Sequence, residues 1–168
     1  LQLNPALTGV FNGNYRVSAL YRSQWGEVLK DESTSQFRTM TFAGDFRIPV
    51  GKNAIGIGVE MLNDKASASN YGTTRGGLAL SYMQSLDRWS QHYVVVGLQG
   101  DIINRTFSPE GLRFGSQWTG VEYDPASGTP EPFLASASQS RNFFDVGAGL
   151  LYFFKGRDDK FTAYAGFS

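Results

Sequence analysis

Residues 54–61 read Ala-Ile-Gly-Ile-Gly-Val-Glu-Met, and this pattern indicates the fold class. Ile55, Ile57, Val59 and Met61 alternate with small or charged residues, which is the period of a β-strand with one apolar face. The same period of two recurs along the chain, and helical periodicity is nowhere better. We therefore predict an all-β fold with strands at residues 15–22, 36–48, 53–62, 75–86, 92–105, 142–154 and 161–168.

The composition narrows the possible functions. The 168 residues suffice for one domain, and 15 Lys and Arg balance 15 Asp and Glu, so the formal net charge is zero. Nucleic-acid binding needs a concentrated basic surface, and we therefore expect no nucleic acid partner. The lack of cysteine excludes disulfides, a Cys-ligated zinc site and a thiol nucleophile. No apolar run reaches the roughly 18 residues of a membrane-spanning helix, so a membrane role would require β-strands.

The predicted connections alternate between long and short. The long ones are residues 23–35, 63–74 and 106–141, and the short ones are residues 49–52, 87–91 and 155–160. In an up-and-down meander, every second connection lies at the same end of the sheet. Tight turns at one end and extended loops at the other are typical of an antiparallel transmembrane β-barrel of the outer membrane, whose turns are periplasmic and whose long loops are extracellular.

The two faces of the predicted strands favour a membrane barrel over a soluble one. The face opposite the large apolar side chains is rich in Gly and Ala, where a soluble barrel would expose polar side chains to water. We therefore expect the apolar face to contact lipid and the glycine-rich face to be enclosed. Arg38 and Arg75 are expected near strand ends, where long side chains reach the membrane interface. Most other strand charges share the enclosed face and could pair there: Arg16, Arg22, Asp45, Arg47, Glu60, Asp101 and Asp145.

The odd number of predicted strands bears on how the barrel closes. Bacterial outer-membrane barrels have even strand numbers, and an open strand edge is not tolerated in lipid. We therefore expect residues 1–168 to form the N-terminal part of a single, larger outer-membrane β-barrel domain.

Residues for catalysis or cofactor binding are scarce. His92 is the single histidine and stands alone at the start of a predicted strand, which favours an interfacial or lumenal place over catalysis. Asp158 and Asp159 are adjacent in a charged segment that reads as a turn, and we expect their side chains to point apart into water. The segment 147–149 resembles the start of a dinucleotide fingerprint, but Tyr152 stands where the third glycine should be. We expect no enzyme, no catalytic or metal site, and no cofactor.

The predicted connection 106–141 is longer than a usual hairpin loop, and such loops are usually functional or disordered. It carries several aromatic side chains among Gly, Pro, Ser and acidic residues. Exposed Trp and Tyr are typical anchors of protein interfaces, so we predict a partner-binding surface with Phe114, Trp118 and Tyr123 as contacts. Alternatively, these aromatic side chains fold inward and plug the lumen, and both arrangements can hold at once.

Short motifs near the N-terminus resemble those of a known family. Asn4-Pro5-Ala6-Leu7-Thr8-Gly9, Tyr15-Arg16 and Tyr21-Arg22-Ser23-Gln24-Trp25 are similar to the N-terminal motifs of PorP/SprF proteins. Residues 112–117 and 144–152 also resemble stretches of that family. The resemblance implies a non-enzymatic outer-membrane barrel of the type IX secretion and gliding apparatus of Bacteroidota. It gives a structural role, as a turn entering the first strand and as packing at its extracellular end, to the motif residues Asn4, Pro5, Arg22, Gln24 and Trp25.

The same resemblance implies partners. Members of the SprF type pair with large secreted proteins, recognise a C-terminal domain and hold it at the cell surface. We therefore expect a barrel in contact with membrane lipid that docks and anchors a secreted cargo protein through its extracellular loops, together with other type IX secretion components. The alternatives are an outer-membrane porin or transporter for small solutes, a soluble ligand-binding barrel and, last, an outer-membrane hydrolase.

Overall fold

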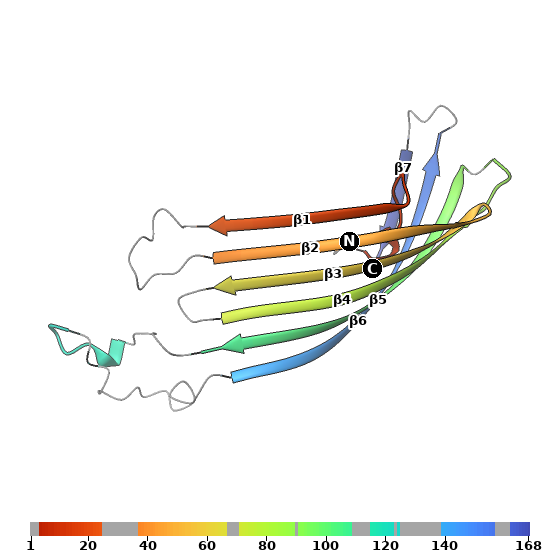
Figure 1. Ribbon diagram of the computed structural model, residues 1–168. Coiled ribbons are helices and arrows are strands. Elements are labelled where there is room, and N and C mark those ends of the chain that lie inside the picture. The colour runs from red at the N-terminus through yellow and green to blue at the C-terminus, as the bar shows by residue number, and fades with distance from the viewer. Residues whose placement is uncertain are drawn as a thin grey trace.

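The computed structural model describes residues 4–24, 37–66, 71–89, 91–108, 115–122, 124, 139–156 and 162–168. Within these residues, seven strands form one antiparallel sheet in which each strand pairs with the next along the chain (Figure 1). The predicted all-β, up-and-down fold is therefore confirmed. The strands are β1 (Tyr15–Gln24), β2 (Phe37–Val50), β3 (Asn53–Ala66), β4 (Tyr71–Ser85), β5 (His92–Phe107), β6 (Gln139–Lys155) and β7 (Thr162–Phe167).

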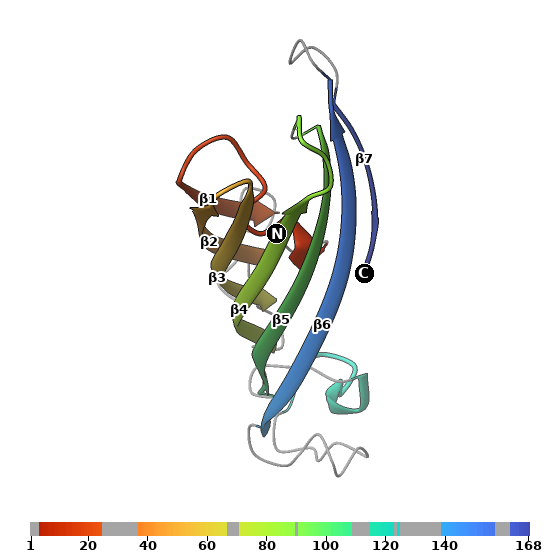
Figure 2. The ribbon, with the colours of Figure 1, turned by 90° about the vertical axis from the view of Figure 1, so that its right-hand side faces the viewer.

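The sheet has the dimensions of a partial barrel. Strands β1 to β6 contain 10 to 17 residues each, and β7 contains 6. A tilted transmembrane strand needs about 9–11 residues, so β1 to β6 are long enough to cross a bilayer. The sheet curls across its width, and the short 3-10 helix η1 (Pro5–Leu7) lies inside the curve (Figure 2). A second 3-10 helix, η3, covers Gly115–Gln117. Among the described residues, no helix has the length and apolar character to span a membrane.

Several strands extend beyond their predicted ends, and the prediction of a long loop at residues 63–74 is wrong. The connection between β3 and β4 is residues 67–70, so long and short connections do not alternate strictly. Polar side chains continue the pairing beyond the apolar stretch, since the Asn63 amide donates to Thr74 Oγ1 at 2.9 Å. The strands extend beyond the stretch of alternating apolar residues because the backbone hydrogen bonds of a ladder do not require apolar side chains.

The other connections keep an asymmetry between the two ends of the sheet (Figure 1). Gly51 has a φ of +63°, a left-handed conformation that lets the β2–β3 hairpin close over two residues. One end holds the connections 25–36 and 108–138 besides 67–70, and the other holds 51–52, 86–91 and 156–161. We call the second end the turn end and the first the loop end.

One carboxylate holds the turn between β4 and β5. Asp87 accepts hydrogen bonds from the backbone N–H groups of Gln91 at 2.8 Å, His92 at 3.1 Å and Trp89 at 3.2 Å. Desolvation acts to raise the pKa of Asp87, but these backbone hydrogen bonds lower it overall from its ordinary value of 3.8. The ionised carboxylate therefore stabilises this turn.

The faces of the curled sheet have the predicted orientation. Ile57, Val96 and Leu98 on the convex face are 42%, 50% and 56% exposed. On the concave face, Ala54 and Glu60 are only 2% and 6% exposed. A soluble barrel would instead gather its large apolar side chains in a dry centre. The convex face is therefore the apolar surface that a lipid environment requires.

The buried core is small and lies where η1 meets the concave face. Ala6 and Val95 are both 0% exposed there. The other members of this cluster come from β3, β4 and β6: Ala54, Met83 and Leu151. The N-terminal segment therefore supplies part of the core of the sheet.

Candidate functional site on the concave face

Residues 4–11, here called the strap, cross the concave face before β1 begins. Asn4 caps η1, because its side-chain oxygen accepts a hydrogen bond from the Ala6 N–H at 2.8 Å. Pro5 supplies the fixed φ that suits the first helical position. Gly9 has a φ of +72°, which lets the chain turn after η1. The local sequence thus specifies a compact turn, which is then seated on the sheet.

Hydrogen bonds fasten the strap to strands that are far apart in the sequence. The Asn4 amide donates to the backbone oxygens of Leu150 on β6 at 3.3 Å and Phe167 on β7 at 3.2 Å. Three further hydrogen bonds join the strap to β2 and β4. Ser81 on β4 donates to the Thr8 carbonyl at 2.6 Å. On β2, Asp45 accepts from the Gly9 N–H at 2.8 Å, and Arg47 donates to the Phe11 carbonyl at 3.0 Å. The strap therefore links β2, β4, β6 and β7.

Glycines in the wall make room for the strap. Gly97 on β5 and Gly149 on β6 are directly opposite each other in the ladder. A Cβ atom at Gly97 would overlap the backbone of Pro5 and Ala6, and a Cβ atom at Gly149 would overlap the Asn4 side chain. Two further glycines, on β3, lie against Thr8: Gly56 and Gly58. The strap thus covers the part of the glycine-rich concave face that carries these four glycines.

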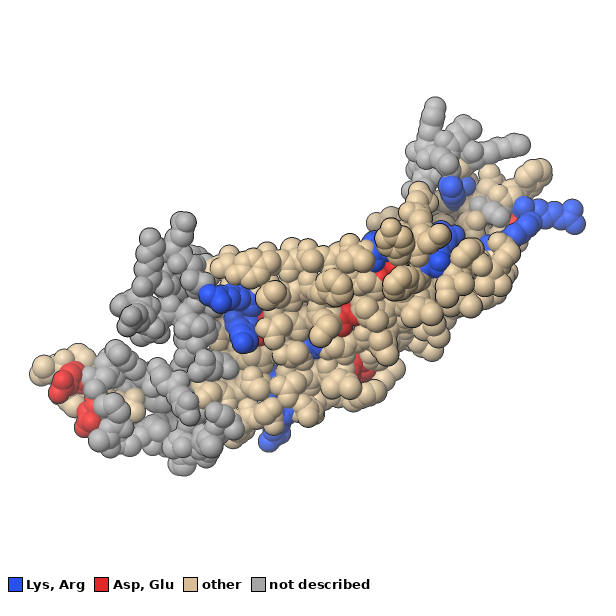
Figure 3. All heavy atoms as spheres, viewed as in Figure 1, with Lys and Arg blue, Asp and Glu red and all other residues tan. Residues whose placement is uncertain are grey.

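Two pairs of opposite charges form on the concave face, and one of them, Arg16–Asp45, joins two residues of the predicted set. Arg16 on β1 donates two hydrogen bonds of 2.9 Å to the buried carboxylate of Asp45 on β2. Arg75 on β4 pairs with the buried Asp101 on β5 at 2.7 Å, and Gln99 donates to both oxygens of the same carboxylate. On the face drawn in Figure 3, most of the surface along the strands is otherwise uncharged. The buried carboxylates of Asp45 and Asp101 are tolerated in this wall because each has a basic partner.

Arg75 does not lie where we predicted. It was expected near a strand end, but β4 begins four residues earlier, at Tyr71. Its guanidinium pairs with Asp101 on the neighbouring strand β5. The prediction was wrong because the polar residues before Arg75 read as a loop. Arg38, the second residue of β2, lies near a strand end as predicted.

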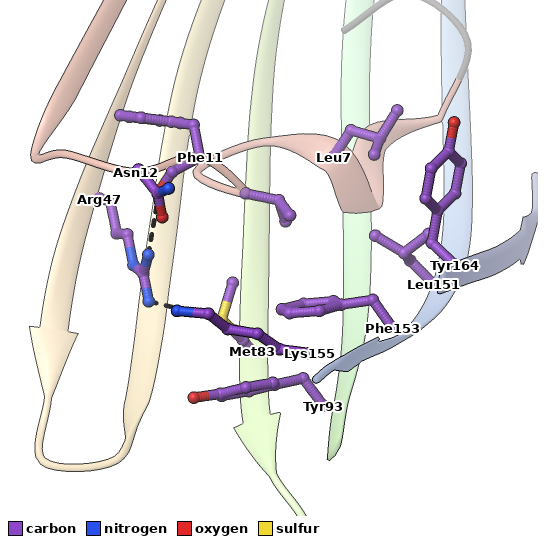
Figure 4. Close-up of a pocket in the computed structure, with 11 residues that line it drawn as sticks. Leu7, Phe11, Asn12, Arg47, Met83, Tyr93, Leu151, Phe153, Lys155 and Tyr164 are labelled. Atoms are coloured by element: carbon purple, nitrogen blue, oxygen red, sulfur yellow. Dashed lines mark hydrogen bonds between the residues drawn. The ribbon is translucent and has the colours of Figure 1, made fainter. Parts of the chain in front are cut away.

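A cavity of about 460 Å³ lies between the strap and the turn end of the sheet. Its lining is mostly apolar, with Leu7 on the strap and Leu151 and Phe153 on β6 (Figure 4). The Tyr93 ring stacks on Phe153, with 4.7 Å between the centroids. Arg47 from β2 also borders the cavity. No sequence pattern indicated this cavity, because its walls come from the strap and from strands that meet only in the folded sheet.

Of the three predicted partner contacts, Trp118 lies within the described residues. Trp118 follows η3 and is 50% exposed, so it presents an aromatic surface at the loop end. A backbone hydrogen bond of 3.0 Å from the Thr119 N–H to the Glu122 oxygen closes the turn after it. Phe114 and Tyr123 lie outside the described residues.

The other residues of the N-terminal motifs divide between the two ends of β1. Arg22 and Gln24 are exposed at the loop end. In the amide orientation that satisfies both side chains, the Gln24 oxygen accepts from Arg22 Nε at 3.2 Å. Trp25 lies outside the described residues. Asn4 and Pro5 form the strap turn, which lies across β5 and β6 before the chain reaches β1.

The lone histidine belongs to an aromatic cluster. His92 Nδ1 lies 2.7 Å from the Tyr152 hydroxyl, and its ring centroid is 4.9 Å from that of Phe154. Aromatic clusters of this kind are common at membrane interfaces. Within the described ranges, no group of three or more His, Asp or Glu side chains could hold a metal ion.

A curled antiparallel sheet with an apolar outer face, an enclosed glycine-rich face and charges paired inside defines the wall of a membrane β-barrel. Over residues 1–168, the chain matches the family described as type IX secretion system membrane protein PorP/SprF, and it belongs to this family. The resemblance seen in the N-terminal motifs is therefore confirmed. Comparisons with curated proteins and with solved structures found no match. The protein is thus a membrane component of type IX secretion.

Proposed function

We propose that this protein docks a secreted cargo protein and anchors it at the cell surface, from a place in the outer membrane, through the connection 108–138. Family membership supports a role in type IX secretion. The cargo would be recognised through its C-terminal domain, and other type IX secretion components would assemble on the same barrel. The loop end of the sheet would face the cell exterior.

The observation that carries this proposal is the asymmetry between the two ends of the sheet. The connection 108–138 is far longer than any connection at the turn end, where β2 and β3 are joined by residues 51–52. Barrels of the outer membrane have short periplasmic turns and longer extracellular loops. Loops longer than about 12–15 residues are uncommon in compact domains and are often functional.

Trp118 supports the loop end as the contact surface. Its side chain is half-exposed on a turn that backbone hydrogen bonds hold together. Tryptophan is enriched among the few residues that dominate binding energy, because it buries a large area with little loss of conformational freedom. Phe114 and Tyr123 flank this turn in the sequence and are proposed as further contacts.

The strap counts against the alternative of a diffusion pore. It crosses the concave face and occupies space that a water-filled lumen would need. The ion pairs Arg16–Asp45 and Arg75–Asp101 also leave less free charge to select passing solutes. A large single-channel conductance of the purified protein in planar bilayers would favour the pore.

The proposal is tested by deleting residues 108–135 from the full-length protein in its host. We expect the barrel to reach the membrane at normal levels, while surface-exposed cargo falls and appears in the medium. Cargo is identified by co-purification in mild detergent followed by mass spectrometry. As a matched control, Lys52→Ala alters the β2–β3 turn at the opposite end and should leave cargo retention unchanged. Unchanged retention in the loop deletion would refute docking through this connection.

A further inference from the structure

We propose that the cavity between the strap and the turn end binds a single-chain amphiphile with an anionic head, of the chemical class of a fatty acid. Its volume of about 460 Å³ lies within the range of pockets that bind small molecules. The cavity lies at the end of the sheet opposite to the proposed docking loop. This proposal therefore stands or falls independently of cargo docking.

The cavity walls form an apolar slot for a hydrocarbon chain. On the sheet side, Met83 and Leu151 are each 3% exposed, and Phe153 stacks on Tyr93. Leu7 borders the slot from the strap side (Figure 4). A hydrocarbon chain that enters this slot exchanges contact with water for contact with these side chains, which is the driving force for burial.

A cation lies at one end of this slot. Arg47 donates one hydrogen bond to the Phe11 carbonyl at 3.0 Å and lies 3.8 Å from the Met83 sulfur. Both acceptors are uncharged, and in the described part of the chain no carboxylate forms an ion pair with Arg47. The Lys155 side chain extends toward Arg47 from β6 (Figure 4). A guanidinium beside an apolar slot, with only uncharged acceptors of its own, is complementary to an anionic head on a hydrocarbon chain.

Backbone hydrogen bonding favours a hydrocarbon chain over a peptide in this slot. The backbone groups of β4, β5 and β6 along the cavity are already paired in antiparallel ladders. A bound peptide would bring N–H and C=O groups that need partners, and the lining is mostly apolar. A hydrocarbon chain brings no such groups.

The test uses the full-length protein in a non-ionic detergent and a tetradecanoate probe that carries a photoreactive diazirine in its chain. After illumination, mass spectrometry locates the labelled residues. We expect labels on the strands that line the slot, around Met83, Leu151 and Phe153. Unlabelled tetradecanoate should compete, whereas tetradecanol, which lacks the charge, should compete at least about tenfold less well, the loss expected for a hydrogen bond to a charged group.

Two further competitors separate the sources of such a ligand. A phosphatidylglycerol with the same chain length should compete poorly because the slot takes one chain, and strong competition by it would overturn the single-chain assignment. A peptide with an apolar C-terminus and a free carboxylate tests the alternative occupant. The proposal is overturned if this peptide competes better than tetradecanoate, if tetradecanol competes equally well, or if labels fall only on the convex face.

Variants provide an independent readout. Arg47→Gln should weaken labelling about tenfold. The matched control Lys52→Gln removes an exposed cation at the same end and should leave labelling unchanged. Leu151→Trp should fill the slot and abolish labelling. Heat-modifiable gel mobility shows whether each variant is folded. If a variant does not fold, the competition series in the unmodified protein still tests the proposal. Equal labelling of Arg47→Gln and Lys52→Gln would overturn the assignment of the head group to Arg47.

Discussion

The close contact between the strap and Gly97 on β5 predicts that Gly97→Ala destabilises the protein. The added Cβ atom would overlap backbone atoms of Pro5 and Ala6, which cannot rotate away as a side chain could. The strap must therefore shift or leave the wall. Gly100 lies on the same strand, and a Cβ atom there meets nothing within 4 Å, so Gly100→Ala is a matched control.

The magnitude follows from two opposing terms. Overpacking of a close contact costs about 1–3 kcal/mol, and the overlap with backbone places this variant near the upper end. Alanine recovers about 0.5–1 kcal/mol over glycine within a strand. We therefore expect a net loss of about 2 kcal/mol for Gly97→Ala and no loss for Gly100→Ala. Complete release of the strap would cost more, because its five hydrogen bonds to the wall contribute about 1 kcal/mol each.

Two measurements check this prediction. Urea unfolding of the protein in lipid vesicles reports the loss of stability. Strap position is read from a single cysteine at Thr8→Cys, because the chain has no cysteine of its own and this residue is 1% exposed. Maleimide should label Cys at this position slowly in the parent and in Gly100→Ala, and faster in Gly97→Ala. Equal stability and equal labelling of the two alanine variants would refute the seating of the strap on Gly97.

Three further variants test other parts of the wall and loops. Asp101→Asn leaves the partly buried Arg75 without its partner and should destabilise the barrel by about 3 kcal/mol in urea unfolding, whereas the exposed Glu122→Gln should have no effect. The pKa of Asp87 is lowered in the folded protein, so the ionised carboxylate stabilises the fold above its unfolded pKa near 3.8, and this stabilisation is lost as the pH falls through the lower folded value. Asp87→Asn should remove this part of the acid dependence. Identical acid unfolding profiles of the variant and the parent protein would contradict this prediction. Trp118→Ala should weaken cargo binding by about 2 kcal/mol, or about 30-fold, with unchanged barrel stability, and a cargo pull-down with unaltered affinity would exclude this side chain as an anchor.

The faces of the strands were predictable from local sequence because side chains alternate with a period of two along any strand. The alternation of Ile57 and Val59 with Gly58 and Glu60 therefore indicated which side is apolar, and the structure has the same orientation. Strand ends were less predictable. The stretch around Asn63 and Thr74 is polar and reads as a loop, although ladder hydrogen bonds continue through it.

Local sequence patterns were sufficient to predict an all-β chain with an apolar face and a glycine-rich face, and the N-terminal motifs indicated the family. Only the folded sheet shows why the glycines are needed and where the strap lies. Asn4 meets Leu150 and Phe167 across sequence separations of 146 and 163 residues, and no local pattern encodes such contacts. The cavity beside Arg47 arises in the same way, because the curl of the sheet brings the strap and the strands β2 and β4 to β7 around one space.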